Sequence, residues 1–201
     1  MYTSILFLEK TTSNNEVETC TDYKEDENYM KIFYHNVKNQ ALFTKENVFA
    51  NSANETFSML ENLEDYKNIE EKFHLKICYP DRVAQSDVSG KCCNEWKQTS
   101  NPVSEGIITG FEKISLAWTK NCAGSDWHGL GLEGQFTHTL IDDTGENERW
   151  CMAVGAIKYE PDDDNPKKYI PGPYNEKIAE PRKVQIVEML VRTGMMLTFS
   201  S

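Results

Sequence analysis

The stretch Phe73-His-Leu-Lys-Ile-Cys-Tyr79 sets the expectation for the whole fold. Its aromatic and aliphatic residues alternate with His74, Lys76 and Cys78, so the two sets of side chains point to opposite faces of an extended chain. Pro80 ends the pattern, because proline has no N–H group to donate to a neighbouring strand. The stretch therefore predicts a β-strand with two distinct faces.

Runs rich in β-forming residues recur along the chain, separated by turns that contain glycine or proline. They are residues 30–35, 41–44, 107–119, 135–141, 150–159 and 184–192. The run 150–159 is apolar on both faces, which predicts a central strand. Between them, Phe57, Leu60 and Leu63 have the three-to-four-residue spacing of a short helix over residues 57–67. We expect an all-β fold, mainly β with one short helix, built as a two-sheet antiparallel sandwich or jelly roll.

The chain has 201 residues, which suits one domain with polar extensions. Residues 1–28 contain a polar, acidic stretch that predicts a flexible N-terminal arm, tethered through Cys20. Residues 29–193 form the predicted β-sandwich domain, and residues 194–201 form a C-terminal tail. No internal repeat interrupts this organisation.

Residues 92–103, Cys-Cys-Asn-Glu-Trp-Lys-Gln-Thr-Ser-Asn-Pro-Val, form the most distinctive block. Trp96 can bury about 200 Å² of surface. The amide and hydroxyl side chains can hydrogen-bond an extended backbone, and the residue before Pro102 favours extended or turn geometry. The block predicts an irregular edge segment that side chains and a disulfide latch onto the sandwich. A ligand-facing role is the alternative.

The net charge of −11 and the pI of about 4.9 limit the classes of partner. Binding to nucleic-acid phosphates needs clustered Lys and Arg, so no nucleic acid is expected as a partner. No run of ~18 apolar residues occurs, so no membrane insertion is expected either. The charge suits cations, neutral ligands such as sugars, or a basic protein, and simple solubility is the alternative explanation.

The six cysteines are all candidates for disulfides: Cys20, Cys78, Cys92, Cys93, Cys122 and Cys151. No C-x-x-C pair is present, which disfavours zinc-knuckle and thioredoxin-like motifs. Cys92 and Cys93 are adjacent, so each is expected to bond a distant partner. This favours an extracellular or cell-surface location. The apolar start of the chain is too short for a signal peptide, which keeps a reduced, cytoplasmic protein as the alternative. Asn54 begins the only glycosylation sequon.

Several blocks taken in order resemble a little-characterised module of extracellular, multidomain proteins of invertebrates and protists. The blocks are KIFYH at 31–35, SMLENL at 58–63, FHLKICYP at 73–80, NEWKQTSNP at 94–102, LIDD at 140–143, WCMAVG at 150–155, IPGP at 170–173 and residues 184–192. The resemblance covers residues 29–193. The closing half is also loosely similar to discoidin-like and other galactose-binding-type sandwiches. Neither resemblance carries catalytic residues, and the first implies a secreted or surface recognition role.

Two loops contain the candidate binding residues. Trp127 and His128 lie in the glycine-rich run 127–132, where Trp127 could stack on a sugar and His128 could hydrogen-bond a hydroxyl group. The alternative is a loop whose tryptophan fills the edge of the core. Asp142, Asp143 and Glu146 surround a glycine and offer the oxygen ligands that Ca²⁺ prefers. The alternative there is a solvated acidic turn.

Catalytic constellations are weak. Cys122 with His128 or His138 is a conceivable nucleophile and base, and Asp142 with Glu148 a conceivable carboxylate pair, but such pairs arise often by chance. We therefore expect a non-enzymatic extracellular recognition or adhesion module with a glycan or protein partner. The alternative is a structural or assembly subunit, with an oligomer formed through the arm and the strand edges, and a hydrolase comes last.

Overall fold

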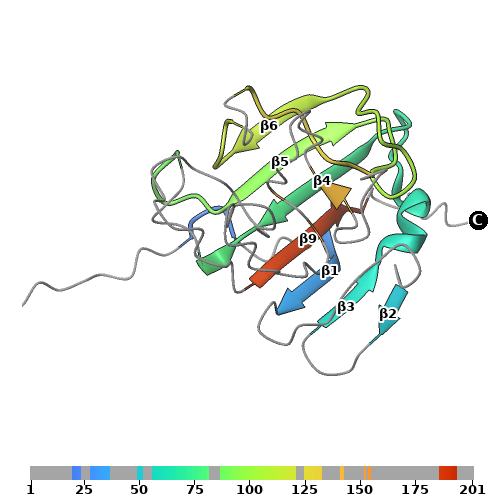
Figure 1. Cartoon of the computed structure of the whole chain (residues 1–201), viewed down its shortest axis with the longest axis horizontal. Helices are drawn as coiled ribbons and strands as arrows, with labels where there is room; N and C mark the ends of the chain where they lie inside the picture. The colour runs from blue at the N-terminus through green and yellow to red at the C-terminus, as the bar shows by residue number, and fades with distance from the viewer. Residues whose placement is uncertain are drawn as a thin grey trace, which may run out of the picture.

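The computed structural model describes residues 20–23, 28–36, 49–51, 56–81, 87–120, 125–132, 141–142, 152, 154 and 186–193. Seven strands form one antiparallel sheet in the order β2-β3-β1-β9-β4-β5-β6 (Figure 1). Their bounds are β1 Tyr29–Asn36, β2 Phe49–Asn51, β3 Thr56–Met59, β4 Phe73–Cys78, β5 Cys93–Gln98, β6 Glu112–Leu116 and β9 Ile186–Arg192. β7 (Gly131–Leu132) and β8 (Ile141–Asp142) form a separate two-stranded ribbon. A mainly β fold is therefore confirmed, and the two-sheet sandwich or jelly roll stays a prediction.

The last strand in sequence lies in the middle of the sheet, between β1 and β4. β9 can occupy this position because it is buried on nearly its whole length, with Val187, Met189 and Val191 fully buried. A strand whose two faces are both covered is expected to carry apolar residues on both. The central strand predicted at 150–159 lies mostly outside the described residues. Within it the structure describes only Met152 and Val154, and both are buried.

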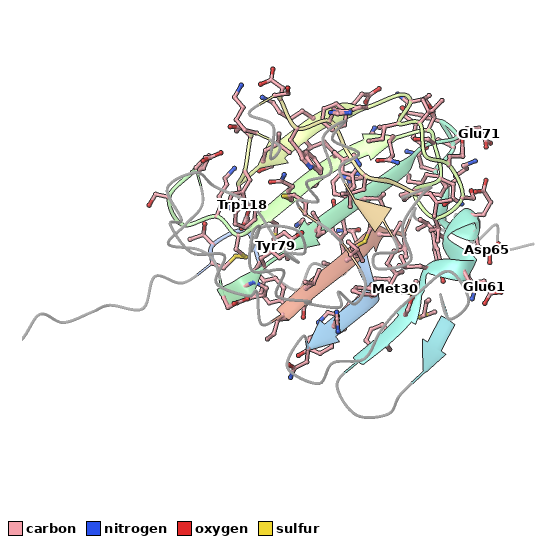
Figure 2. All side chains as sticks on the ribbon, in the orientation of Figure 1. Met30, Glu61, Asp65, Glu71, Tyr79 and Trp118 are labelled. Carbon is pink, nitrogen blue, oxygen red and sulfur yellow. A yellow bond between two sulfur atoms is a disulfide. The ribbon has the colours of Figure 1, made fainter. Side chains whose placement is uncertain are left out.

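The predicted helix at 57–67 is correct only in its second half. Residues 56–59 form β3, in which Phe57 pairs with Tyr34 of β1 and stacks on its ring. The 3₁₀-helix η3 (Leu60–Tyr66) follows and buries Leu60 and Leu63. A 3₁₀-helix has three residues per turn, so these two leucines face the same side. Glu61 and Asp65 are exposed and point away from the sheet (Figure 2).

Residues 93–98 form an interior strand, so the prediction of an irregular edge segment for 92–103 is wrong in this half. β5 pairs with β4 on one side and with β6 on the other. Two polar residues on its core face are fully buried and satisfied by distant backbone groups. The Asn94 side chain donates to the Trp118 carbonyl and accepts from the Trp118 N–H, both at 2.9 Å. Buried amides with such partners are compatible with a core, and sequence alone does not show the partners.

The predicted strand at 107–119 is shorter in the structure, because only residues 112–116 pair with β5. Residues 99–111 instead form turns, with the Asn101 side chain accepting from the Val103 N–H at 2.9 Å. Ile107 is 79% exposed, as a loop residue can be. The predicted strands at 41–44 and 135–141 lie outside the described residues, except for Ile141 in β8.

The core is rich in tryptophan, with Trp96, Trp118 and Trp127 all buried. Trp118 packs edge-on against Tyr79, with ring centroids 5.3 Å apart (Figure 2). Gln98 links β5 to residues 125–132: its Oε1 accepts from the Trp96 indole at 2.7 Å, and its Nε2 donates to the Leu130 carbonyl at 2.9 Å. Gly129 allows this approach, because it has a φ of +109° and a Cβ there would lie 2.8 Å from Gln98 Oε1.

We predict that Gly129→Ala destabilises the fold more than Gly90→Ala does. Both glycines have positive φ, so alanine adds backbone strain of about 1 to 2 kcal/mol at either position. At Gly129 the methyl group also collides with Gln98, whereas at Gly90 its nearest neighbours are 3.5 Å away, in ordinary contact. The collision should add about 1 to 3 kcal/mol. Chemical denaturation of the two variants measures the difference, and equal losses would contradict the close packing at Gly129.

Candidate functional site

The tryptophan of the glycine-rich loop is part of the core. Trp127 is 2% exposed and packs edge-on against Trp96, with centroids 4.9 Å apart, and against Phe111, at 5.8 Å. His128 is exposed, with its Nδ1 3.3 Å from the Asp126 carbonyl oxygen. The structure therefore does not bring Trp127 and His128 together on one surface. This geometry matches the alternative in which the tryptophan fills the edge of the core.

The acidic loop and most other candidate residues cannot be placed. Asp142 lies in β8 opposite Gly131, but its side chain is outside the described residues. The remaining candidates outside the described part are Asn54, Cys122, His138, Asp143, Glu146, Glu148 and Cys151. The calcium site, the glycosylation site and the conceivable catalytic pairs stay predictions.

The face of the sheet opposite Trp96 carries several charged side chains. Alternation along β4 sends His74 and Lys76 to this face, and the antiparallel register places Lys76 opposite Glu95 of β5. The register of β1 against β9 and of β9 against β4 places Tyr29 on the same face. These side chains come from β1, which is distant in sequence, and from the consecutive strands β4 and β5. Tyr29, His74, Lys76 and Glu95 are here called the sheet-face cluster.

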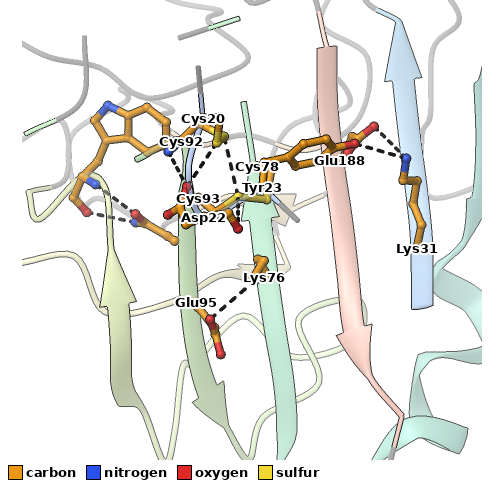
Figure 3. The surroundings of a disulfide bond; sticks show 12 residues. Cys20, Asp22, Tyr23, Lys31, Lys76, Cys78, Cys92, Cys93, Glu95 and Glu188 are labelled. Carbon is orange, nitrogen blue, oxygen red and sulfur yellow. Dashed lines mark hydrogen bonds and ion pairs between the residues drawn. A yellow bond between two sulfur atoms is a disulfide. The ribbon is translucent and has the colours of Figure 1, made fainter. Parts of the chain in front are cut away.

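Hydrogen bonds and charge hold the sheet-face cluster together. The Tyr29 hydroxyl donates to Glu95 Oε1 at 2.7 Å and lies 2.8 Å from His74 Nε2. His74 Nε2 is also 2.9 Å from the same carboxylate oxygen. Lys76 forms an ion pair with Glu95 (Figure 3), in which the ammonium is 3.7 Å from Glu95 Oε2. The same ammonium is 4.6 Å from the centre of the Tyr29 ring. Each side chain therefore restrains the others.

The environment fixes the charge of Glu95. Burial alone would raise its pKa, but hydrogen bonds from His74 and Tyr29 and the charge of Lys76 outweigh burial and lower the pKa from 4.5 to about 2. A carboxylate with so low a pKa binds protons too weakly to act as a general base near neutral pH. It remains a hydrogen-bond acceptor with a fixed negative charge, which suits a structural or ligand-binding role.

A second ion pair lies further along the same face. Lys31 Nζ is 2.8 Å from Glu188 Oε1, and the Glu188 side chain is only 3% exposed. Burial would lower the pKa of Lys31, but the hydrogen bond and the charge of Glu188 raise it overall. Burial raises the pKa of the neighbouring Tyr23 hydroxyl, and the Glu188 carboxylate raises it further. Figure 3 shows Tyr23 beside Glu188, so the N-terminal segment covers this end of the face.

One disulfide fixes that covering segment, residues 20–23, to the start of β5, and a second disulfide joins β4 to β5. Cys20 bonds Cys92, with Cα atoms 5.6 Å apart, and Cys78 of β4 bonds Cys93 of β5, with Cα atoms 4.1 Å apart. This confirms that the two adjacent cysteines bond separate partners, and that the arm is tethered through Cys20. Disulfides form and persist in an oxidising environment, which is therefore where this form of the chain belongs.

Hydrogen bonds add to the attachment of this segment. The Thr21 N–H donates to the Gly90 carbonyl at 2.7 Å, and Asp22 Oδ1 accepts from the Cys92 N–H at 2.8 Å. No cysteine in the described part of the chain is free. Among the same residues, no helix has the length and apolar character needed to cross a membrane.

Sequence reasoning missed most of the sheet-face cluster. It recognised His74 only as a strand residue and did not single out Tyr29, Lys76 or Glu95. The alternation at 73–79 was a usable signal, because it places His74 and Lys76 on one face. Glu95 could not be matched to them while residues 92–103 were interpreted as irregular.

The chain was compared with protein-family models, curated proteins and solved structures, and none of them matches it. The resemblance to an extracellular module stays a prediction.

We predict that Glu95→Gln lowers the free energy of unfolding at pH 7. The same substitution should also make that free energy fall less as the pH is lowered. The folded-state pKa of Glu95 lies below its ordinary value, so its contribution is present above pH 4.5 and is lost as the pH falls to about 2. Because the side chain is 19% exposed and its contacts are shared, we expect a loss on the order of 2 kcal/mol at pH 7.

Urea denaturation of the wild type and of Glu95→Gln at several pH values between about 2 and 7 measures both effects. Glu70→Gln is the matched control, because it removes an exposed carboxylate that pairs with Lys97 at 3.1 Å. Such an exposed pair contributes about 1 kcal/mol or less. Parallel pH profiles for Glu95→Gln and the wild type would show that the cluster does not hold Glu95 ionised.

Proposed function

We propose that the chain is a non-enzymatic extracellular recognition module that binds glycans through the sheet-face cluster. The observation that carries the proposal is the convergence of Tyr29, His74, Lys76 and Glu95 at hydrogen-bond distances on one face of the sheet. The two disulfides support the extracellular location. The resemblance to extracellular and galactose-binding-type modules points the same way.

The chemistry of the cluster suits sugars. A sugar offers hydroxyl groups that donate to carboxylates and accept from ammonium groups, and C–H faces that pack on aromatic rings. Glu95 and Lys76 keep 19% and 12% of their side chains exposed, and Tyr29 is half-buried. The Glu95 carboxylate as acceptor, the Lys76 ammonium as donor and the edge of the Tyr29 ring are thus within reach of a ligand on the surface.

Rigidity also supports a binding role. Side chains that are already fixed lose little conformational freedom when a ligand binds, which improves affinity. The cluster stands on strands rather than loops, and its members hold each other in place. The low pKa of Glu95 favours binding over acid–base catalysis at this position.

The glycan array is the test, run with and without Ca²⁺ because the acidic residues near 142 predict a calcium requirement. We expect a defined subset of glycans to bind the wild type. Tyr29→Phe and Lys76→Ala should each lower affinity by about tenfold, the effect of losing one hydrogen bond to a charged or phenolic group. Glu70→Gln should bind like the wild type.

Thermal melting must show that each variant is folded at the assay temperature, so that loss of binding is not loss of structure. A blank array, or binding that Tyr29→Phe and Lys76→Ala leave unchanged, would overturn the proposal. A blank array together with defined oligomers in solution would favour the alternative of an assembly subunit.

A further inference from the structure

Arg192, the last residue of β9, is an exposed cation without a partner among the described residues. Most other cations in the described part of the chain pair with carboxylates, namely Lys31, Lys67, Lys72, Lys76, Lys97 and Lys120. A guanidinium group is planar and always charged, and it can bind a carboxylate through two parallel hydrogen bonds. Arg192 therefore offers a binding group that the fold itself does not use.

The register of the sheet places Arg192 beside the sheet-face cluster. Its Cα partner on β1 is Tyr29. On the other side of β9, Val191 pairs with Leu75 of β4, so Arg192 lies alongside His74, the residue before Leu75. Val191 and Leu75 are fully buried on one face of the sheet, and alternation sends Arg192 and His74 to the other face. Arg192 thus lies between two members of the cluster.

Two hydrogen bonds at the end of β9 bring Arg192 close to Tyr29. The Thr193 N–H donates to the Asn28 carbonyl at 2.9 Å, and the Thr193 hydroxyl donates to the same oxygen at 3.2 Å. In an antiparallel ladder, the first of these bonds flanks a non-hydrogen-bonded pair, which here is Tyr29 and Arg192. The Cα atoms of such pairs are about 4.5 Å apart, and their side chains approach more closely than in hydrogen-bonded pairs. A ligand that contacts Tyr29 is therefore within reach of Arg192.

The charges of the cluster determine what Arg192 can add to it. Lys76 already pairs with Glu95, so these two side chains together carry no excess charge for an anion. Arg192 supplies that charge at the border of the cluster. The net charge of −11 repels ligands that carry many negative groups. A ligand with a single acidic group fits both conditions, because one guanidinium binds one carboxylate.

We propose that the glycan bound by the sheet-face cluster carries one carboxylate, and that Arg192 binds this carboxylate through two hydrogen bonds. This inference rests on the proposed function and narrows its ligand class from glycans in general to saccharides that contain a uronic or sialic acid. Glu95 accepts from the sugar hydroxyl groups and Lys76 donates to them, while Arg192 holds the acidic group. Arg192 is thus the residue that sets specificity for the carboxylate.

Matched pairs of saccharides on the glycan array test the inference. The probes are oligosaccharides that end in glucuronic acid and their counterparts that end in glucose, which differ in a carboxylate against a CH₂OH group. We expect the wild type to bind the acidic member about tenfold more tightly, the effect of one hydrogen-bonded ion pair at an exposed site. Arg192→Gln should lose this preference and bind both members as the wild type binds the neutral one. Arg192→Lys should keep only part of it, because an ammonium lacks the planar fork.

Lys113→Gln is the matched control. Lys113 is an exposed cation on β6, the edge strand of the sheet, and it also has no partner among the described residues. Its replacement changes the net charge by the same amount as Arg192→Gln does, but at a site away from the cluster. It should therefore leave the preference for the acidic member unchanged. Thermal melting shows that each variant is folded at the assay temperature.

Equal binding of both members by the wild type would overturn the inference and leave the proposed function intact, because glycans would still bind. A preference that survives in Arg192→Gln, or that Lys113→Gln removes to the same extent, would also overturn it. Tighter binding of heavily sulfated glycans than of the glucuronic acid probes would do the same. A blank array would overturn the proposed function and this inference with it.

Discussion

The adjacent pair Cys92 and Cys93 is the constraint on which the rest of the structure depends. One residue bonds Cys20 and the next bonds Cys78, so a single point at the start of β5 joins the N-terminal segment and β4. The two bonds span 72 and 15 residues. By the chain-entropy estimate, closing loops of these lengths stabilises the fold by about 4 and about 3 kcal/mol. The register of β4 against β5, and with it the pairing of Lys76 with Glu95, is fixed at its end by a covalent bond.

The charged face of the sheet follows from this register and from the position of β9. β9 completes the sheet between β1 and β4, although it comes from the far end of the described chain. It brings Glu188 next to Lys31 and sets the distance from β1 to β4 at which Tyr29 reaches His74. The sheet-face cluster can therefore form only when strands that are distant in sequence have all paired. Long-range pairing of this kind is slow in folding, and the disulfides reduce the chain entropy that opposes it.

Sequence alone was sufficient where a pattern depended only on neighbouring residues. The alternation of 73–79, the β-forming run that starts near Met30 and the apolar strand near the C-terminus were all predicted and are β4, β1 and β9. The separate partners of Cys92 and Cys93 were predicted as well, because adjacent cysteines rarely bond each other. These features need no knowledge of which strands lie side by side.

The errors arose where partners are distant. Asn94 and Gln98 are polar residues on the core face of β5, and only Trp118 and Leu130 show that they are satisfied there. Phe57 fits a helical spacing with Leu60, but it pairs with Tyr34 of β1 instead. For the same reason Trp127 was open to two interpretations, until its contacts with Trp96 and Phe111 placed it in the core. The sheet-face cluster was out of reach, because it requires the strand order.

Peptide mapping of the oxidised chain under non-reducing conditions tests the central constraint most directly. Digestion followed by mass spectrometry identifies which cysteine-containing peptides are linked. The structure requires one bond that joins Cys20 to Cys92 and another that joins Cys78 to Cys93. Because Cys92 and Cys93 are adjacent, each bond is assigned by cleavage between these two residues or by fragmentation of the joined peptides. A bond between Cys92 and Cys93, or the exchanged pairs Cys20–Cys93 and Cys78–Cys92, would contradict the account of how β5 organises the fold.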